Sequence, residues 1–348
     1  MPGADEGLLV RFEDIYIAGC GSWLPPAVSA EQAAADGLCD AALAAQNAMD
    51  AVTVSADLAG PELAVRAARA ALADAGAAGE TVELLLHSAL YYQGHDMWAP
   101  ASYVARETVG DRCPAIDIRQ TSNGGMASLA LAASFLSTRP AGDSALLTCG
   151  DRFCPPGIDR WRSDPGTVFA DGGAAVVASR GGGFARLRSL VLHSDSSLEA
   201  MHRGDDPFSP GPMTRRTPLN VRHTTRAYLR AEGASFVVGR MATGQHLVLK
   251  TALAEAGVEL SDIRRFVLPN FGRRRMDNTF FQPFEIDPAQ TTWPWGRGIG
   301  HLGAGDQFAG LRHLLDTDGL RPGDLCALLG VGGGFSWSCA ILEMTNPG

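Results

Sequence analysis

The sequence lacks the features that mark membrane, exported, metal-binding and nucleic-acid-binding proteins. It has no run of about 18 uncharged apolar residues, so no transmembrane span is expected. Its first residues lack the basic-then-apolar pattern of a secretory signal peptide, which favours a cytoplasmic protein. The seven cysteines are scattered and lie mostly in apolar runs, so we interpret them as buried thiols rather than disulfides or metal ligands. A net charge of −9 without a long basic stripe argues against general nucleic-acid binding.

An internal repeat is the main feature of organisation that is present. The segment Ala71–Gly76 (ALADAG) resembles Ala252–Gly257 (ALAEAG), so the two copies are offset by 252 − 71 = 181 in the numbering. The apolar run that follows and a later Gly-Asp pair, at 142–143 and 323–324, keep the same offset without a gap. Three matches at a single offset predict that the chain is a duplication of one structural unit.

The repeated unit has the pattern of an α/β fold. Apolar residues recur at helical spacing before glycine stops, and short apolar runs bounded by turn residues indicate strands covered on both faces. We therefore expect two similar halves, each a sheet with helices, packed in layers. The expected divisions are an N-terminal half at 1–180, a connecting loop region at 181–222 and a C-terminal half at 223–348.

A turn between a short strand and a helix carries the first candidate residue. The strand is predicted at 114–118 and the helix at about 123–136, which places Ser122 at the helix N-terminus. Serine is a favoured helix cap, and this is the simplest interpretation. The alternative is a nucleophile, because free backbone N–H groups and the helix dipole stabilise a developing negative charge there.

A second turn, Gly300–Gln307, occupies the equivalent place in the other half. Position 303, which equals 122 + 181, lies in it, so Ser122 and His301 belong to matching turns although they are far apart in the sequence. If the halves pack about a pseudo-twofold axis, the two side chains approach each other. Asp306 would then orient His301, as in a nucleophile–base–acid triad. The alternatives are a helix-capping role for Asp306 and a half-buried structural histidine at position 301.

Further candidate residues lie near these turns in the predicted topology. Asn270, at the end of a repeat strand, could donate an amide hydrogen bond to a substrate carbonyl, or could simply suit a turn. Gly333, in a glycine-rich hairpin, could complete an oxyanion hole with its N–H. His202 lies in a polar loop, where a solvated histidine is the simplest interpretation. Five arginines form either a solvated rim or a dock for phosphate or an acidic partner: Arg264, Arg265, Arg273, Arg274 and Arg275.

Several motifs resemble the ketoacyl-acyl carrier protein synthase III family of the thiolase superfamily. They are the segments Asp164–Asp171 (DPGTVFAD), Asp262–Pro269 (DIRRFVLP) and Gly332–Ser338 (GGGFSWS). The resemblance implies the five-layered αβαβα thiolase fold, a homodimer and no tightly bound cofactor. Family members load an acyl group from coenzyme A onto a cysteine and join it to a malonyl unit on the phosphopantetheine of an acyl carrier protein.

The chain departs from this family at all three catalytic positions. Ser122 stands at the position of the family cysteine, Asn270 at that of its histidine and His301 at that of its asparagine. The family glycine and carrier-docking arginine correspond to Gly333 and Arg275. The family signature that grips coenzyme A is not visible between residues 30 and 57. Four later residues could substitute for it: Arg152, Arg160, Trp161 and Arg162.

The Ser122 substitution together with the later His301 and Asp306 is similar to a narrower subgroup. These are the acyltransferase-like homologues that supply propionyl starter units in daunorubicin- and doxorubicin-type polyketide pathways. The likeness implies a Ser122–His301–Asp306 triad, a catalytic part for His202, propionyl-CoA as substrate, and action beside a minimal polyketide synthase.

The chemistry explains why the substitutions occur together. A thiol of pKa about 8.5 readily becomes a thiolate at a helix N-terminus, whereas an alcohol needs a neighbouring base. We therefore predict an acyltransferase that passes a short acyl group through Ser122 to a carrier protein. Decarboxylative condensation, transfer to a small-molecule hydroxyl or amine, and a non-catalytic partner subunit remain alternatives. The walls of the acyl tunnel are expected among four residues: Met97, Trp98, Phe208 and Met213.

Overall fold

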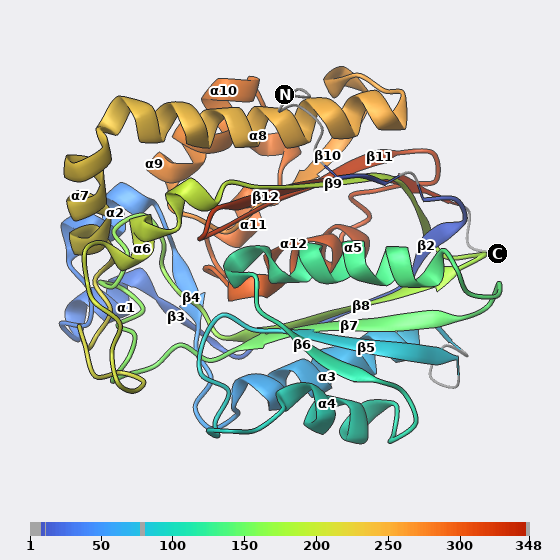
Figure 1. The fold of residues 1–348 in the computed structure, drawn as a ribbon, viewed down its shortest axis with the longest axis horizontal. Coiled ribbons are helices and arrows are strands. Elements are labelled where there is room, and N and C mark those ends of the chain that lie inside the picture. Colours follow the sequence, from blue (N-terminus) through green and yellow to red (C-terminus); the bar gives the residue numbers. More distant parts are fainter. Residues whose placement is uncertain (1–7, 11, 77–80, 346–348) are drawn as a thin grey trace.

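The computed structural model describes residues 8–10, 12–76 and 81–345, and shows helices and strands stacked in alternating layers (Figure 1). The strands of the N-terminal half, in spatial order, are β6 (Ala115–Ile118), β5 (Val82–Ser88), β7 (Ser144–Asp151), β8 (Gly172–Arg180) and β2 (Ile15–Trp23). Those of the C-terminal half are β10 (Ile263–Val267), β11 (Leu325–Gly332), β12 (Ser336–Met344) and β9 (Ala185–Ser194), with β1 (Leu8–Val10) paired to β9. Two residue pairs between β2 and β9 connect the two sets.

Helices cover both sheets and fill the space between them. The central layer contains α5 (Gly124–Leu136) and α12 (Asp306–Asp316), which contact strands of both halves. The outer layers are α3 (Gly60–Asp74) with α4 (Pro100–Thr108) on one side, and α8 (Ala234–Ala256) on the other. This arrangement confirms the predicted layered α/β fold.

The duplication is visible in the strand pairing. In β5–β7–β8–β2 the successive pairs are parallel, antiparallel and antiparallel, and β10–β11–β12–β9 repeats that series. Strand β7 begins at Ser144 and β11 at Leu325, and these two positions keep the offset that the repeated sequence segments have. Strand β9 lies inside the segment 181–222, so this segment supplies part of the second sheet rather than only a connecting loop.

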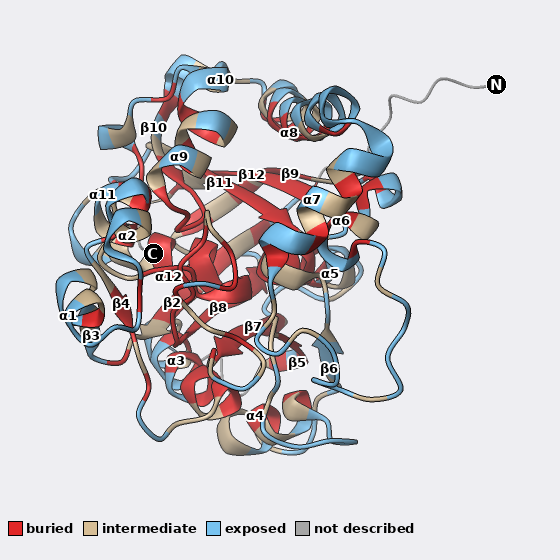
Figure 2. Cartoon of the chain, turned by 90° about the vertical axis from the view of Figure 1, so that its left-hand side faces the viewer, coloured by how far each residue is buried: buried red, intermediate tan, exposed pale blue. Residues whose placement is uncertain are grey.

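Close packing in the N-terminal half depends on small residues. A Cβ added at Gly21 of β2 would lie 2.5 Å from the backbone nitrogen of Ala71 in α3. Alanines on α3 and glycines on the sheet therefore allow the helix backbone to approach the strands directly. The strands and the central helices form the buried interior (Figure 2).

Toward one end of the layers lie β3 (Ala27–Ser29), β4 (Ala51–Thr53), α1 (Ala30–Ala35), α2 (Ala41–Asn47), α6 (Ala200–Arg203), α7 (Val221–Glu232) and α9 (Arg273–Met276) (Figure 1). Two further short helices are α10 (Gln282–Phe284) and α11 (Trp293–Gly296). Across the described parts of the chain, no helix combines the length and apolar character needed to cross a membrane. All seven cysteines are free, and five of them are buried.

Candidate active site

The turn that carries Ser122 is held in an unusual backbone conformation. Strand β6 leads through a 3₁₀ turn, Thr121–Asn123, into α5. Thr121 has φ +48°, a left-handed conformation that costs energy for a β-branched residue and persists only where its surroundings enforce it. Its hydroxyl donates to the carbonyl of Gly333 at 3.0 Å, which ties the turn to the far half of the molecule. The side chain of Ser122 does not cap α5, so the capping interpretation is wrong.

The turn that carries His301 is fixed from two sides. Gly300 and Gly303 have φ values of +86° and +67°, which glycine adopts without a steric penalty. The backbone of His301 pairs with Val168 and Ala170, at 2.9 and 2.8 Å. Its ring is 2% exposed. The imidazole consequently has little freedom to turn away.

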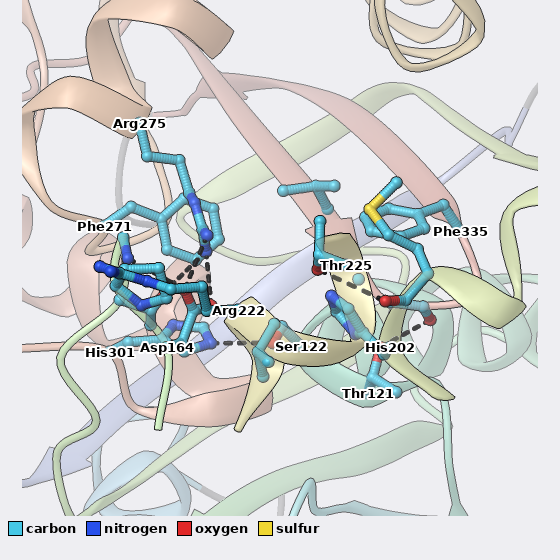
Figure 3. A pocket seen from close by; sticks show the side chains of 18 of the residues that line it. Thr121, Ser122, Asp164, His202, Arg222, Thr225, Phe271, Arg275, His301 and Phe335 are labelled. Atoms are coloured by element: carbon cyan, nitrogen blue, oxygen red, sulfur yellow. Dashed lines mark hydrogen bonds and ion pairs between the residues drawn. The ribbon is translucent and has the colours of Figure 1, made fainter. Parts of the chain in front are cut away.

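The two turns bring three functional groups into one hydrogen-bonded line. Ser122 Oγ lies 2.8 Å from His301 Nε2 (Figure 3), and His301 Nδ1 lies 2.6 Å from Asp306 Oδ2. The Asp306 carboxylate also accepts the backbone N–H groups of Asn270 and Leu302, each at 2.8 Å. Because a carboxylate only accepts, Nδ1 carries the hydrogen and Nε2 is left to accept the Ser122 proton.

Ser122 and His301 line a cavity of about 990 Å³, and other residues of its wall come from α2, α7, α8 and α9. The cavity is large enough for an extended ligand that carries a small reacting group to the serine. Its wall beside the serine is built by Gly332, Gly333 and His202. A hydroxyl on the wall of such a cavity, backed by a buried imidazole and carboxylate, can form and release an acyl ester.

Comparisons with known proteins place the chain in a family. Residues 116–196 match the family 3-oxoacyl-[acyl-carrier-protein (ACP)] synthase III, and residues 253–344 match its C-terminal part. The solved structure of ChlB3, described as an acyltransferase, is 35% identical, with 96% of this chain and 99% of that chain covered and a TM-score of 0.89. The chain belongs to the ketoacyl-acyl carrier protein synthase III family.

Other synthase III proteins are more distant. The proteins from Bradyrhizobium diazoefficiens and Rhodospirillum centenum are 28% and 29% identical, over 94% and 81% of this chain and 98% and 83% of theirs. The synthase III structure from Pseudomonas aeruginosa is 24% identical, with a TM-score of 0.76 over 96% of this chain and 99% of that one, which shows a shared fold. The thiolase fold is thereby confirmed, and the chain is an acyltransferase-type enzyme. Enzymes of this family use acyl-CoA and the phosphopantetheine of a carrier protein, without a tightly bound cofactor.

Asn270 does not have the position expected for a substrate-binding amide. Its Nδ2 donates to the carbonyl of Gly300 at 2.9 Å and to Asp306 Oδ1 at 3.3 Å, and the residue is absent from the cavity wall. The expectation that this amide holds a substrate carbonyl is therefore wrong, because its donors are used within the protein. In this structure Asn270 instead helps to fix Asp306.

His202, expected to be a solvated loop residue or a catalytic one, lies on the cavity wall. Its ring packs edge-on against Phe335, with ring centroids 5.2 Å apart, and against the backbone of Gly333. The ring faces the cavity, yet enough protein surrounds it that desolvation lowers its pKa. The charge of Arg275 adds to this effect, whereas Asp164 opposes it. The neutral imidazole is consequently favoured beside the serine.

The five arginines do not form one cluster at one strand end. Arg264 and Arg265 lie near the beginning of β10, whereas 273–275 follow the end of that strand in α9. Arg275 makes a two-pronged ion pair with Asp164, at 2.8 and 2.8 Å (Figure 3). This pair outweighs the effect of burial and lowers the pKa of Asp164. Arg273 pairs with Asp277 at 2.8 Å, which leaves Arg274 as the one exposed member beside the cavity.

The residues expected to bind coenzyme A in place of the family signature make other contacts within the protein. Arg160 is bound to the buried Asp171 at 3.1 Å, and Trp161 is buried. Arg152 and Arg162 donate to backbone carbonyls, and none of the four lines the cavity. Of the expected tunnel residues, Met213 lines the cavity, but three are exposed outside it: Met97, Trp98 and Phe208.

Sequence reasoning missed the arginines that do line the cavity. Arg222 and Arg226 extend from α7, and Arg215 precedes that helix. The spacing of Arg222, Arg226 and Arg230 at four-residue intervals is a signal that the sequence contains. It points to one basic helix face beside the cavity.

Proposed function

We propose that the chain takes a short acyl group, propionyl, from coenzyme A onto Ser122 and passes it to an acyl carrier protein as a polyketide starter unit. The observation that carries the proposal is the continuous contact from Ser122 Oγ through His301 to Asp306, at 2.8 and 2.6 Å. The relation to ChlB3, described as an acyltransferase, supports the same class of reaction. The enzyme would act as a homodimer beside a minimal polyketide synthase.

In the first half-reaction, His301 Nε2 removes the Ser122 proton while Oγ attacks the thioester carbonyl carbon. The carbonyl oxygen becomes an oxyanion, which the backbone N–H groups of Ser122 and Gly333 would stabilise. Asp306 stabilises the imidazolium without taking its proton. The oxyanion then collapses, the C–S bond breaks, and His301 returns the proton to the coenzyme A sulfur.

In the second half-reaction, the phosphopantetheine thiol of the carrier protein takes the place of coenzyme A. His301 accepts the thiol proton, the sulfur attacks the acyl ester, and the C–O bond to Ser122 breaks as the serine regains a proton. His202, neutral and facing the same part of the cavity, would hydrogen-bond the attacking thiol and help to orient it.

Decarboxylative condensation with malonyl carrier protein is the second candidate. That reaction needs two hydrogen-bond donors at the enolate oxygen of the malonyl thioester. Here the Asn270 amide is used by Gly300 and Asp306, and His301 is engaged by Asp306. These contacts favour acyl transfer over condensation.

The test is to acylate the enzyme with propionyl-CoA, remove free coenzyme A, and offer separate acceptors. We expect propionyl transfer to the thiol of holo-carrier protein, and loss of that transfer in Ser122→Ala. Malonyl carrier protein should remain unchanged. A β-ketoacyl product from it would establish condensation instead, and acylation of a small hydroxyl or amine compound in place of the carrier would establish the small-molecule alternative.

A further inference from the structure

Helix α7 presents a row of arginines on its exposed face. Arg222, Arg226 and Arg230 follow at intervals of four residues and are all exposed. The opposite face of the helix buries Val221, Thr224 and Tyr228. Residues four apart lie next to each other on a helix surface, so the three guanidinium groups form a single basic strip. Figure 2 shows α7 at the surface beside α6.

The arginines of the strip form no ion pair within the parts of the chain that the structure describes. No ion pair involves Arg222, Arg226 or Arg230, and the same is true of Arg215 and Arg274 on the cavity wall. Neighbouring like charges on a helix repel one another. Arginines without an ion-pair partner along the wall of one cavity, in a chain of net charge −9, therefore indicate a surface that receives an anion.

Two hollows meet at this strip. Arg222 and Arg226 line the large cavity that contains Ser122, and they also line a smaller one of about 310 Å³. The smaller hollow is completed by Arg230, with Asn220 and His223 beside it. The basic residues thus lie along the wall of the cavity that leads to the serine, and not on an unrelated face.

We propose that the arginines of α7 bind the phosphate groups of the acyl thioester's carrier arm. This inference rests on the proposed function and names how its substrate is held. Guanidinium groups bind phosphate oxygens through paired hydrogen bonds, and a row of them suits a ligand with several phosphate oxygens. The phosphates come either from the nucleotide end of coenzyme A or from the phosphopantetheine of a carrier protein.

Other arginines near the cavity are already committed. Arg275 and Arg216 are paired with Asp164 and Asp206, and Arg160 is paired with Asp171. The α7 strip, supplemented by Arg215 and Arg274, is the cationic surface left beside the cavity in the described residues. This accounts for binding of coenzyme A in a chain without the family's N-terminal signature.

The experiment compares the double variant Arg222→Gln/Arg226→Gln with the wild-type enzyme on three acyl donors. The donors are propionyl-CoA, propionyl-4′-phosphopantetheine and propionyl-pantetheine, which lacks phosphate. We expect kcat/KM for propionyl-CoA to fall about tenfold, mainly through KM, with a smaller loss in the Lys/Lys variant, which keeps the charge. The reaction with propionyl-pantetheine should remain within twofold of wild type.

The pattern across donors identifies the phosphate. A loss confined to propionyl-CoA supports contact with the nucleotide phosphates, and a loss with both phosphorylated donors supports contact with the pantetheine phosphate. Equal losses with all three donors, or no loss with any, would overturn the inference. The matched control is Arg321→Gln, an exposed arginine in the turn before β11, which should match wild type. Acylation of Ser122 by propionyl-pantetheine tests the proposed function separately.

Discussion

Replacing Asp306 with asparagine tests the orientation of the catalytic base. The carboxylate accepts four donors: His301 Nδ1 and the Asn270 backbone at Oδ2, and the Leu302 backbone and Asn270 Nδ2 at Oδ1. An asparagine amide keeps one oxygen and replaces the other with an NH₂ group. The two protein donors on that side therefore face a donor instead of an acceptor. If the NH₂ group lies at the Oδ2 position, it donates to Nδ1 and forces the hydrogen onto Nε2, which can then no longer accept the Ser122 proton.

The expected loss is large in rate and moderate in stability. The wrong tautomer of a triad histidine lowers the chemical step by roughly 10⁴-fold in serine proteases. One buried backbone N–H left facing a donor costs about 1–3 kcal/mol of folding free energy. The rate is measured as single-turnover acylation of Ser122 by propionyl-CoA, followed by intact mass. The stability is measured by urea unfolding.

The matched control is Asp316→Asn, the same change at the exposed end of α12, where the residue pairs with Arg312. An exposed pair contributes about 0–1 kcal/mol, so this variant should acylate at the wild-type rate. Acylation of Asp306→Asn within threefold of wild type, in a folded protein, would refute the role given to the carboxylate.

The same region of the structure supports three further predictions. Gly333→Ala should slow acylation at least tenfold, because the added methyl group collides with the ring of His202 and displaces the proposed oxyanion donor; kinetics with propionyl-CoA check this, and an unchanged rate would contradict it. Asn270→Ala should lower kcat about tenfold with little change in KM, because Asp306 loses one restraint while its backbone donor remains; a change confined to KM would instead indicate substrate contact. Burial raises the pKa of Asp151 to about 7, so in the folded state its carboxyl stays protonated over a range in which the unfolded chain is ionised. Its contribution to stability should therefore decline from about pH 4 to about pH 7, by at most about 1.4 kcal/mol per pH unit; urea unfolding across this range should show a shallower decline in Asp151→Asn, and an equal slope would disprove the assignment.

The sequence contained enough information to predict the architecture and the meeting of the two turns. The constant offset between the two halves can be read from the sequence, and the first residues of β7 and β11 keep it in the structure. Gly300 and Gly303 indicate the turn of His301 in the sequence, and in the structure both glycines have positive φ. Because duplicated α/β units place equivalent turns at a common axis, Ser122 and His301 could be paired without a structure.

The sequence did not show in which direction each side chain points, or which hydrogen-bond and ion-pair partners it binds. Asn270 and Asp306 are well separated in the sequence, and only the folded chain shows that their hydrogen-bonding groups satisfy each other. The arginines at 264–265 and 273–275 are close in sequence, but the first two lie near the start of strand β10 and the other three follow its end. Arg160 was expected to help bind coenzyme A, but in the folded chain it forms an ion pair with the buried Asp171.

The central claim is that the acyl group is carried as an oxygen ester on Ser122. The most direct measurement is tandem mass spectrometry of peptides from enzyme incubated with propionyl-CoA, with and without neutral hydroxylamine, which cleaves thioesters far faster than oxygen esters. The account predicts one propionyl group on the peptide containing Ser122, retained under neutral hydroxylamine and absent from Ser122→Ala. A propionyl group on any of the seven cysteines, lost to hydroxylamine and still present in Ser122→Ala, would contradict it.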